Sequence, residues 1–368
     1  MSVDFEAEGL LEGVEGRERE VRLALLRELH ADGVPLEELR RAVREGRLAL
    51  LPVERALEAS GPRYTLEEVA QAAGVDAGML RRYRQALGLP IEDESERVGT
   101  EGDMEAARRL RILLDAGLPE EGLLEVTRVI GLSMSQVAAA SRAVIIEAYV
   151  DEDDTELDVA RRFVAAAVTL RPLLGEILEH ALRLHLLEQV RHDVLDLPAA
   201  TRAANTTEIT ACFADLVGFT RLGERLPVDE LGAVTGRLAE LASEAAHGGV
   251  RLVKLIGDGA LLVGADNEAV VEAGLELLER AEADPDFPQL RVGMARGPAI
   301  TRAGDWYGPP VNAAARITAI ARPGSILVDE SVKRAISGDA YTFSYAGSRK
   351  LKGMREEHRL YRLRRARI

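Results

Sequence analysis

Cysteine is nearly absent from this 368-residue chain, which contains only one. That single thiol, Cys212, excludes an internal disulfide and a zinc site built from cysteines. It lies in an apolar stretch, where a lone cysteine is most simply a small core residue. The fold must therefore depend on apolar burial, and a chain of this length with 47% hydrophobic residues can supply cores for two domains.

Positive charge is outnumbered by negative charge, because the chain has 47 Lys and Arg residues against 62 Asp and Glu residues. The net charge of −15 means that the chain as a whole is repelled by nucleic acid and by anionic lipid. The first stretch, MSVDFEAEGLLEGVEGRERE, lacks the basic and apolar regions of a signal peptide. We expect no membrane span, since no apolar run approaches the ~20 residues that one needs. The protein is therefore expected in the cytoplasm, without a membrane partner.

The helix-forming residues Leu, Ala, Arg and Glu recur at three- and four-residue spacing through the first half of the chain. This pattern predicts an all-helical domain over residues 1–195. Residues 196–208 are small and polar and include a proline, so they predict a linker. Beyond them, β-rich and helical segments follow in the order βαββαβ over residues 209–368. This order predicts an α+β domain of ferredoxin-like type, with a mixed or antiparallel sheet and helices on one face.

Residues 64–90, YTLEEVAQAAGVDAGMLRRYRQALGLP, have the spacing of a helix-turn-helix, and Arg81, Arg82 and Arg84 lie on the second helix. The stretch resembles the opening of the MerR-type DNA-binding domain. Two interpretations remain open: the second helix enters a DNA groove, or the module packs against protein with its arginines paired or solvated. The acidic run IEDESE follows directly, and phosphate contact needs an excess of base, so DNA binding is disfavoured.

The last predicted helix of this half covers residues 172–195, with Pro172 at its start. It carries His180, His185 and His192, and at about 100° per residue the last two share a face. A single histidine on a helix is usually a solvated or packed residue. Three of them before a domain junction suggest a pH-responsive coupling helix, because histidine titrates near neutrality. An apolar groove between helices of this domain, holding a lipid or another small ligand, also stays open.

Two aspartates stand at the ends of apolar strands. Asp215 is followed by Gly218, which lets the backbone turn and present N–H groups to an anion, and Asp258 lies at the tip of the hairpin signal Gly257–Gly259. If the two strands are neighbours, both carboxylates converge at one end of the sheet. Mg²⁺ typically takes one or two protein carboxylates and completes its shell with water and phosphate oxygens. Taken singly, each aspartate is more often a turn or capping residue than a metal ligand.

Three motifs carry a family resemblance: FADLVGFTRL, KLIGDG and GDWYGPPVNAAARIT. They closely resemble, in the same order, the motifs of the class III nucleotide cyclases, and the resemblance covers roughly residues 205–366. It implies that Asp215 and Asp258 bind two Mg²⁺ or Mn²⁺ ions. It also implies the reaction, in which the ribose 3′-oxygen attacks the α-phosphorus of a nucleoside triphosphate and pyrophosphate leaves.

The same resemblance assigns the substrate contacts. Lys254 matches the base-reading lysine and Asp305 its partner acid, while Asn312 matches the residue that orients the ribose. Arg316 matches the arginine that meets the phosphates in the transition state, and it shares a helix face with Asn312 at i, i+4 spacing. Further substrate contacts are implied for Gly218, Phe219, Thr220 and Lys352.

The base can be predicted from hydrogen-bond chemistry. Adenine offers an acceptor at N1 and a donor at N6, which a lysine donor and an aspartate acceptor complement, whereas guanine inverts this pattern. A mismatched base leaves buried groups unpaired, so Lys254 with Asp305 favours ATP over GTP. We therefore predict an adenylyl cyclase, with a guanylyl cyclase as the weaker alternative.

In this family the site forms between two catalytic domains, one supplying the metal-binding aspartates and the other the remaining groups. This chain carries all of them, so the resemblance implies a head-to-tail homodimer. The whole chain resembles the soluble actinobacterial cyclases in which an all-helical N-terminal domain restrains the catalytic domain, closest to the mycobacterial pH-responsive type. The alternative from another class is a DNA-binding regulator whose C-terminal domain senses a nucleotide.

Overall fold

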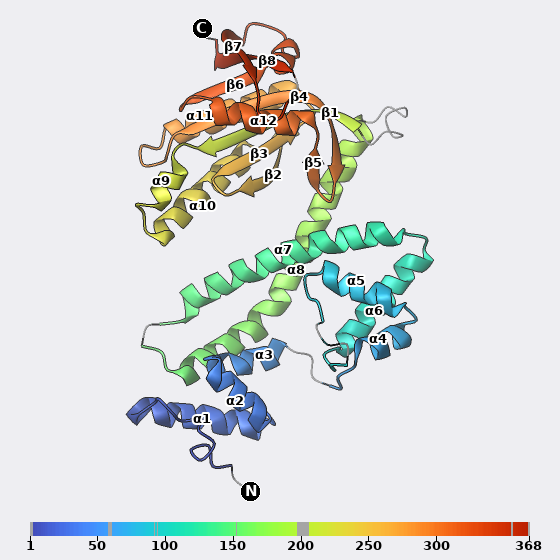
Figure 1. The fold of residues 1–368 in the computed structure, drawn as a ribbon, viewed down its shortest axis with the longest axis vertical. Coiled ribbons are helices and arrows are strands. Elements are labelled where there is room, and N and C mark those ends of the chain that lie inside the picture. The colour runs from blue at the N-terminus through green and yellow to red at the C-terminus, as the bar shows by residue number, and fades with distance from the viewer. Residues whose placement is uncertain are drawn as a thin grey trace. The chain divides into compact units, whose positions relative to one another are not determined.

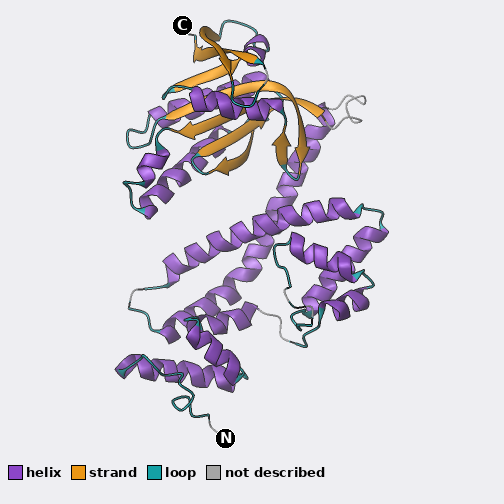
Figure 2. Cartoon of the chain, viewed as in Figure 1, coloured by secondary structure: helices purple, strands orange, loops and turns teal. Residues whose placement is uncertain are grey.

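The computed structural model divides the chain into two compact units, Met1–Leu187 and Glu188–Ile368 (Figure 1). It describes residues 3–57, 61–91, 93, 95–151, 153–196, 206–354 and 356–366, and of residues 191–196 and 228–229 it describes the backbone alone. Figure 2 shows helices in the first unit and a sheet with helices in the second. This layout fits the predicted two-domain architecture. Most of the predicted linker lies outside the described residues, so its bounds stay a prediction.

The first unit contains two separate apolar cores. The helices that build it are α1 (Gly16–Ala31), α2 (Leu36–Arg44), the 3₁₀ turn η1 (Leu48–Leu50), α3 (Leu51–Leu57), α4 (Leu66–Ala73), α5 (Ala77–Ala86), α6 (Glu101–Asp115), α7 (Glu120–Tyr149) and α8 (Glu156–Asp196). One core joins α1, α2 and the start of α3 to Ala160 of α8. The other joins α4, α5 and α6 to Leu124 of α7. The two longest helices thus each begin in a different core.

The predicted helix-turn-helix is present as α4 and α5. Thr65 and Glu68 form a capping box that starts α4, and Gly74 ends it in the left-handed region with φ of 69°. Asp76 caps α5 by accepting a hydrogen bond from the Met79 N–H at 2.8 Å. Local capping chemistry therefore fixes both helices and the turn between them.

The second helix of this module packs inside the unit. Arg82 forms an ion pair with Glu120 at the start of α7, and Arg84 pairs with an aspartate of α6 at 2.7 Å. Helix α7 comes so close that a Cβ on Gly131 would lie 2.6 Å from the carbonyl oxygen of Leu87. A helix held this way by its neighbours favours the packing interpretation over insertion into a DNA groove.

Helix α7 differs from expectation. By length and composition it is long enough and apolar enough to cross a membrane, with a mean hydropathy of 1.6 over its most apolar window. The expectation that no segment approaches this length was wrong, because Val, Ile and Leu recur along α7 among small, uncharged residues with few charges between them. Length and composition alone do not distinguish a membrane span from a helix that packs on protein, and Leu124 and Gly131 near its start are buried.

Helix α8 corrects a predicted boundary. It is a single helix of 41 residues with Pro172 in its interior, so the prediction that a helix begins at residue 172 was wrong. Proline removes one backbone hydrogen bond and crowds the preceding turn, at a cost of ~3 kcal/mol, which the remaining turns of so long a helix outweigh. His180 and His185 are exposed on α8. The side chain of His192 lies outside the described residues.

The second unit is built on an eight-stranded sheet in the order β2-β3-β1-β4-β6-β8-β7, with β5 paired to β4. The strands are β1 (Thr206–Leu216), β2 (Arg251–Ile256), β3 (Gly259–Gly264), β4 (Leu290–Arg302), β5 (Asp305–Tyr307), β6 (Ser325–Asp329), β7 (Tyr341–Lys350) and β8 (Glu357–Arg365). The helices are α9 (Phe219–Gly223), α10 (Val228–Ala245), α11 (Asn267–Glu282), α12 (Pro309–Ile320) and α13 (Glu330–Arg334). The order β2-β3-β1-β4, with α10 and α11 as crossovers, is the predicted ferredoxin-like core, and only β4 and β6 pair in parallel.

Helices cover both faces of this sheet (Figure 1). On the face of α10 and α11, a Cβ on Gly274 would lie 2.1 Å from the end of Met294. On the other face, a Cβ on the adjacent Gly293 would lie 2.3 Å from the backbone nitrogen of Thr318 in α12. The expectation of helices on one face was therefore wrong. Alternate residues of the central strands are apolar on both sides, so each face needs its own cover.

The end of β6 yields a testable pH dependence. Asp329 is 8% exposed, and its Oδ1 accepts hydrogen bonds from Ser331 Oγ and the Val332 N–H at 2.6 and 2.9 Å. Burial raises the pKa of the Asp329 carboxyl, and these hydrogen bonds lower it only in part. A raised pKa in the folded state means that stability is lost as the pH rises through that pKa.

We therefore expect Asp329→Asn, which keeps the acceptor oxygen but cannot ionise, to stabilise the catalytic unit at pH 7 by about 1 kcal/mol. The gain should disappear near pH ~4, where aspartate in the unfolded chain is itself protonated. Thermal unfolding at both pH values measures it. The exposed helix cap Asp266, changed to Asn, is the control and should show little difference at either pH. An equal loss of stability at both pH values would contradict the assignment.

Candidate active site

The two predicted metal-binding aspartates lie together at one end of the sheet. Asp215, near the end of β1, stands opposite Gly259 of β3, and the N–H of Leu216 donates to the carbonyl of Asp258 at 3.0 Å. Gly257 and Asp258 form the tight turn between β2 and β3, with Gly257 in the left-handed region at φ of 59°. The strand pairing therefore brings the two carboxylates side by side, as the hairpin signal predicted.

This carboxylate pair suits a hard divalent cation that also binds phosphate. Among the described residues, no cluster of three or more His, Cys, Asp or Glu side chains forms a complete protein cage for a metal. Two carboxylates are what Mg²⁺ usually takes from a protein when a nucleotide supplies the remaining oxygens. The donor set thus fits Mg²⁺ or Mn²⁺ held jointly by Asp215, Asp258 and a triphosphate.

Arg291 is a residue of this site that the sequence reasoning missed. It lies opposite Asp215 on β4, and its Nε and Nη2 both donate to Asp215 Oδ2, at 2.8 and 2.5 Å. Its Nη1 donates to the carbonyl of Ala319 in α12 at 3.2 Å. The available signal was a charged residue within the apolar strand LRVGMA.

Three effects act on the pKa of the Asp215 carboxyl: two raise it and one lowers it. Burial raises the pKa of its carboxyl above the ordinary value, while the hydrogen bonds and positive charge of Arg291 lower it. The negative charge of Asp258 raises the pKa further. A cation between the two carboxylates would relieve both the burial cost and their repulsion.

The predicted base-reading residues also meet. Lys254 lies at a bulge in β2, and its Nζ donates to Asp305 Oδ2, although 50 residues separate them in sequence. The other oxygen, Asp305 Oδ1, accepts from the N–H of Trp306 at 2.8 Å. The pairing of β5 with β4 therefore fixes Asp305 in place, and the ammonium of Lys254 is oriented by it.

Asn312 and Arg316 lie one turn apart on α12. Arg316 Nη1 donates to the backbone carbonyl of Asn312 at 3.0 Å, and the Asn312 side chain is exposed. Arg316 also lies near the turn that carries Lys352, because a Cβ on Gly353 would be 3.5 Å from Arg316 Nη2. The structure thus places Asn312, Arg316 and the turn that carries Lys352 close together.

The turn after β1 is formed as predicted, with a difference at one residue. Gly218 has φ of 78° in the left-handed region and precedes the short helix α9. Thr220 is exposed, but the ring of Phe219 packs against the apolar core beneath α10 and α11. Any contact of Phe219 with a substrate would therefore use its backbone.

The site residues fall into two groups within one chain. Of the hydrogen bonds and ion pairs between described residues, none connects Asp215 or Asp258 to Lys254 or Asp305. None connects them to the residues of α12 that are predicted to bind the ribose and phosphates. The carboxylate pair is linked instead to Arg291. Among the described residues, these contacts therefore form two sets that share no hydrogen bond or ion pair.

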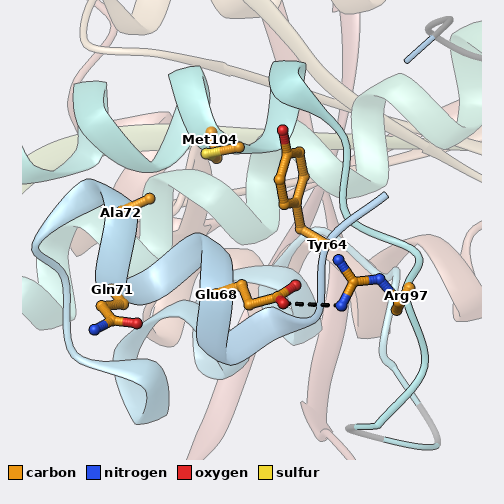
Figure 3. A pocket seen from close by; sticks show the side chains of 6 residues that line it. All are labelled: Tyr64, Glu68, Gln71, Ala72, Arg97 and Met104. Atoms are coloured by element: carbon orange, nitrogen blue, oxygen red, sulfur yellow. Dashed lines mark hydrogen bonds and ion pairs between the residues drawn. The ribbon is translucent and has the colours of Figure 1, made fainter. Parts of the chain in front are cut away.

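The helical unit contains a hollow of about 430 Å³ that is lined by Tyr64, Glu68, Gln71, Ala72, Arg97 and Met104. Figure 3 shows an ion pair between Glu68 and Arg97 at its wall, at 2.8 Å. Backbone and side-chain hydrogen bonds, chiefly from Thr65 and then Arg97, lower the pKa of Glu68. A charged wall of this kind differs from the apolar groove predicted for a lipid, which stays a prediction.

Two family models match this chain. One described as adenylate cyclase regulatory domain matches residues 3–190, and one described as adenylate and guanylate cyclase catalytic domain matches residues 201–365. The pH-sensitive adenylate cyclase MT1302 of Mycobacterium tuberculosis (strain CDC 1551 / Oshkosh) is 36% identical, over 98% of this chain and 92% of its own length. The chain belongs to the class III adenylate cyclase family.

Two further similarities accompany this assignment. An adenylate cyclase of Streptomyces coelicolor (strain ATCC BAA-471 / A3(2) / M145) is 32% identical over 73% of this chain and 70% of its own length. The crystal structure of the adenylyl cyclase CyaB from P. aeruginosa is 22% identical, with a TM-score of 0.39, over 44% of this chain and 96% of that one. The protein is an adenylate cyclase, a phosphorus–oxygen lyase, and the resemblance predicted from the three motifs is confirmed.

The carboxylate pair of this adenylate cyclase gives a test that does not depend on turnover. We expect Mn²⁺ to raise the melting temperature of the wild type, because a ligand that binds only the folded state at 100 times its Kd adds ~2.7 kcal/mol. Asp215→Asn should lose most of this rise. Asp286→Asn, in an exposed loop, is the matched control and should keep it. If Mn²⁺ raises the melting temperature of Asp215→Asn as much as that of the wild type, Asp215 does not bind the metal.

Proposed function

We propose that this enzyme converts ATP to 3′,5′-cyclic AMP and pyrophosphate at two equivalent sites of a head-to-tail homodimer. The observation that carries the proposal is that the described site residues of one chain form two sets that share no hydrogen bond or ion pair. Asp215 and Asp258 form one ordered group, and Lys254 with Asp305 forms another, without a bond between them. A second copy, related by a twofold axis, would place the first group of one chain opposite the second group of the other.

In the proposed reaction the ribose 3′-oxygen forms a bond to the α-phosphorus. The bond from that phosphorus to the α–β bridging oxygen breaks in line, and the 3′-hydroxyl proton passes to solvent. Asn312 would hold the ribose in this in-line orientation, which lowers the entropic part of the activation barrier. Arg316 and Lys352 would stabilise the negative charge that develops on the phosphates.

Divalent cations supply the remaining chemistry. Two Mg²⁺ or Mn²⁺ ions held by Asp215 and Asp258 would lower the pKa of the 3′-hydroxyl and neutralise the phosphate oxygens. In this structure Arg291 donates to Asp215 Oδ2 alone, and Oδ1 is left on the side of Gly259, where Asp258 stands next along the chain. Among the described contacts, Asp215 Oδ1 thus accepts no hydrogen bond from Arg291 and lies on the side of Gly259.

The Lys254–Asp305 pair supports adenine as the base. The ammonium of Lys254 can donate to adenine N1, and the carboxylate of Asp305 can accept from the N6 amine. Guanine would oppose its N1–H to the ammonium and its O6 to the carboxylate. A site that leaves such groups unpaired discriminates strongly between the two bases.

We expect the purified chain with Mn²⁺ or Mg²⁺ to form cyclic AMP from ATP, with at least ~100-fold lower kcat/KM for GTP. Chromatography of the cyclic products measures both rates. Asp215→Ala should abolish the activity, and Asp286→Ala in the exposed loop should leave it unchanged. A preference for GTP would establish the guanylyl alternative, and no product from either nucleotide would contradict the proposed function.

Complementation tests the shared site. Asp215→Ala and Arg316→Ala should each be inactive alone, because each homodimer lacks one group at both sites. Co-expressed in equal amounts, half of the dimers contain one intact site, so about a quarter of wild-type activity should return. Purification through two different affinity tags enriches that heterodimer. No recovery in the enriched heterodimer would show that each chain builds its site alone.

We further infer that the helical unit restrains catalysis and responds to pH. The regulatory-domain match to residues 3–190 supports the first point, and the pH-sensitive relative at 36% identity supports the second. His180 and His185 are exposed on α8, the helix that joins the two units. A location in the cytoplasm is part of the same proposal.

The expected result is that fragment 200–368 is more active than the full chain, and that replacing His180, His185 and His192 by Gln flattens the pH–activity profile. Each rate is measured between pH 5.5 and 8, where histidine changes charge. His30→Gln, on an exposed position of α1, is the control variant. An unchanged profile in the triple variant would exclude these histidines as the sensor, and a fragment no more active than the full chain would exclude restraint.

A further inference from the structure

The C-terminal half of α8 exposes large apolar side chains along one side. Leu173, Ile177, Leu184 and Leu187 are 52%, 62%, 51% and 45% exposed, respectively. Leaving such side chains in water is unfavourable by about 25 cal/mol per Å² of apolar surface. A helix with so much exposed apolar surface usually buries it against another element.

The spacing of these residues is that of a coiled-coil seam. Leu173, Ile177, His180, Leu184 and Leu187 are separated by four, three, four and three residues, which is the heptad pattern of alternating core positions. On the opposite side of the helix, Leu182 and Leu186 are just as exposed, at 61% and 54%. A stripe with the same spacing on that side includes Gly175, Glu179 and Gln189, so it is not a continuous apolar seam.

We propose that residues 173–187 of α8 pair with the same residues of a second copy of this chain, in a parallel, in-register, two-stranded coiled coil. The proposal rests on the homodimer of the proposed function and names the contact that brings the two copies together. In this proposal, the exposed apolar residues of α8 are covered by the same residues of the second copy.

The charges beside the seam favour the parallel direction. Arg183 directly precedes the core residue Leu184, and Glu188 directly follows the core residue Leu187. In a parallel pair these two flanking positions, five residues apart, face each other across the seam, so Arg183 meets Glu188 of the partner subunit. The twofold symmetry of the pair repeats this ion pair on the other side of the seam. Exposed ion pairs add little affinity, but they set direction and partner choice.

His180 occupies the one polar position of the seam. Its Nδ1 lies 2.8 Å from Arg183 Nη2, so the imidazole is already oriented by the residue that flanks the next core position. A single polar residue at a core position lowers the stability of a coiled coil but specifies its register. His180 opposite its counterpart would therefore favour the in-register pairing over a shift by one heptad.

A parallel pair has a direct consequence for the two-group site. Both helices end on the same side of the pair, and their twofold axis runs along the seam. Two catalytic units that follow such helices are related by the same axis. Each unit can then offer its Asp215–Asp258 group to the Lys254–Asp305 group of the other.

Disulfide trapping tests the seam in the full chain. Two cysteines can be bridged only when their Cα atoms come within about 7 Å, and the native Cys212 is buried in the core. We expect Leu173→Cys and Leu187→Cys each to form a covalent dimer under mild oxidation, seen on a non-reducing gel. Leu182→Cys and Leu186→Cys, equally exposed on the other side, should form at least tenfold less.

Three outcomes would overturn the proposal. Equal disulfide formation on both sides of α8 would indicate random collision. No disulfide at either Leu173→Cys or Leu187→Cys would show that these residues do not pair between two copies. Trapping of the Leu173→Cys/Leu187→Cys double variant, but of neither single variant, would show antiparallel pairing.

A charge in the seam separates this proposal from the proposed function. Leu184→Glu should shift the dimer–monomer midpoint, measured by light scattering on dilution, to at least tenfold higher concentration, and Leu182→Glu should not. Circular dichroism of both variants checks that α8 stays folded. If complementation succeeds while Leu184→Glu leaves the midpoint unchanged, the shared site stands and the coiled coil is wrong. If the wild type is active as a monomer, both are wrong.

Discussion

The fold of the catalytic unit depends on neutralising one carboxylate inside a sheet. Asp215 is half-buried near the end of a central strand, where burial raises the pKa of its carboxyl and Arg291 opposes that effect. The antiparallel register of β1 with β4 places the arginine directly across from the aspartate. The other neighbour, β3, has Gly259, a residue without a side chain, opposite Asp215. Strand pairing alone thus arranges a carboxylate pair with an arginine counter-ion.

Much of this arrangement could be predicted from local sequence. The turn at Gly257 and Asp258, the capping of α4 and α5, and the ferredoxin-like strand order all follow from short-range patterns that the structure contains. The meeting of Lys254 with Asp305 could be predicted only from the resemblance to a family, because no local pattern relates residues 51 positions apart.

Other features depend on contacts that the sequence pattern does not specify. Arg291 acquires its role from the register of two strands, and a one-residue shift would turn it to the other face. The position of α12 on the second face depends on the close approach at Gly293. Pro172 predicted the start of a helix, but it lies inside the long continuous helix α8. The local preference of proline for a first turn therefore did not decide where this helix begins. The membrane-like composition of α7 arises from Val, Ile and Leu spread over a long stretch with few charges, which no single motif indicates.

Helix α12 has one more consequence when two copies share their sites. Its first turns carry Asn312 and Arg316, which serve one site, and the carbonyl of Ala319 near its end anchors Arg291 on Asp215, which serves the other. In the proposed shared site, the same twelve-residue helix would therefore reach the substrate at one centre and, through Arg291, position Asp215 at the other. A shift of this helix at one centre would then also move the counter-ion of the carboxylate at the other.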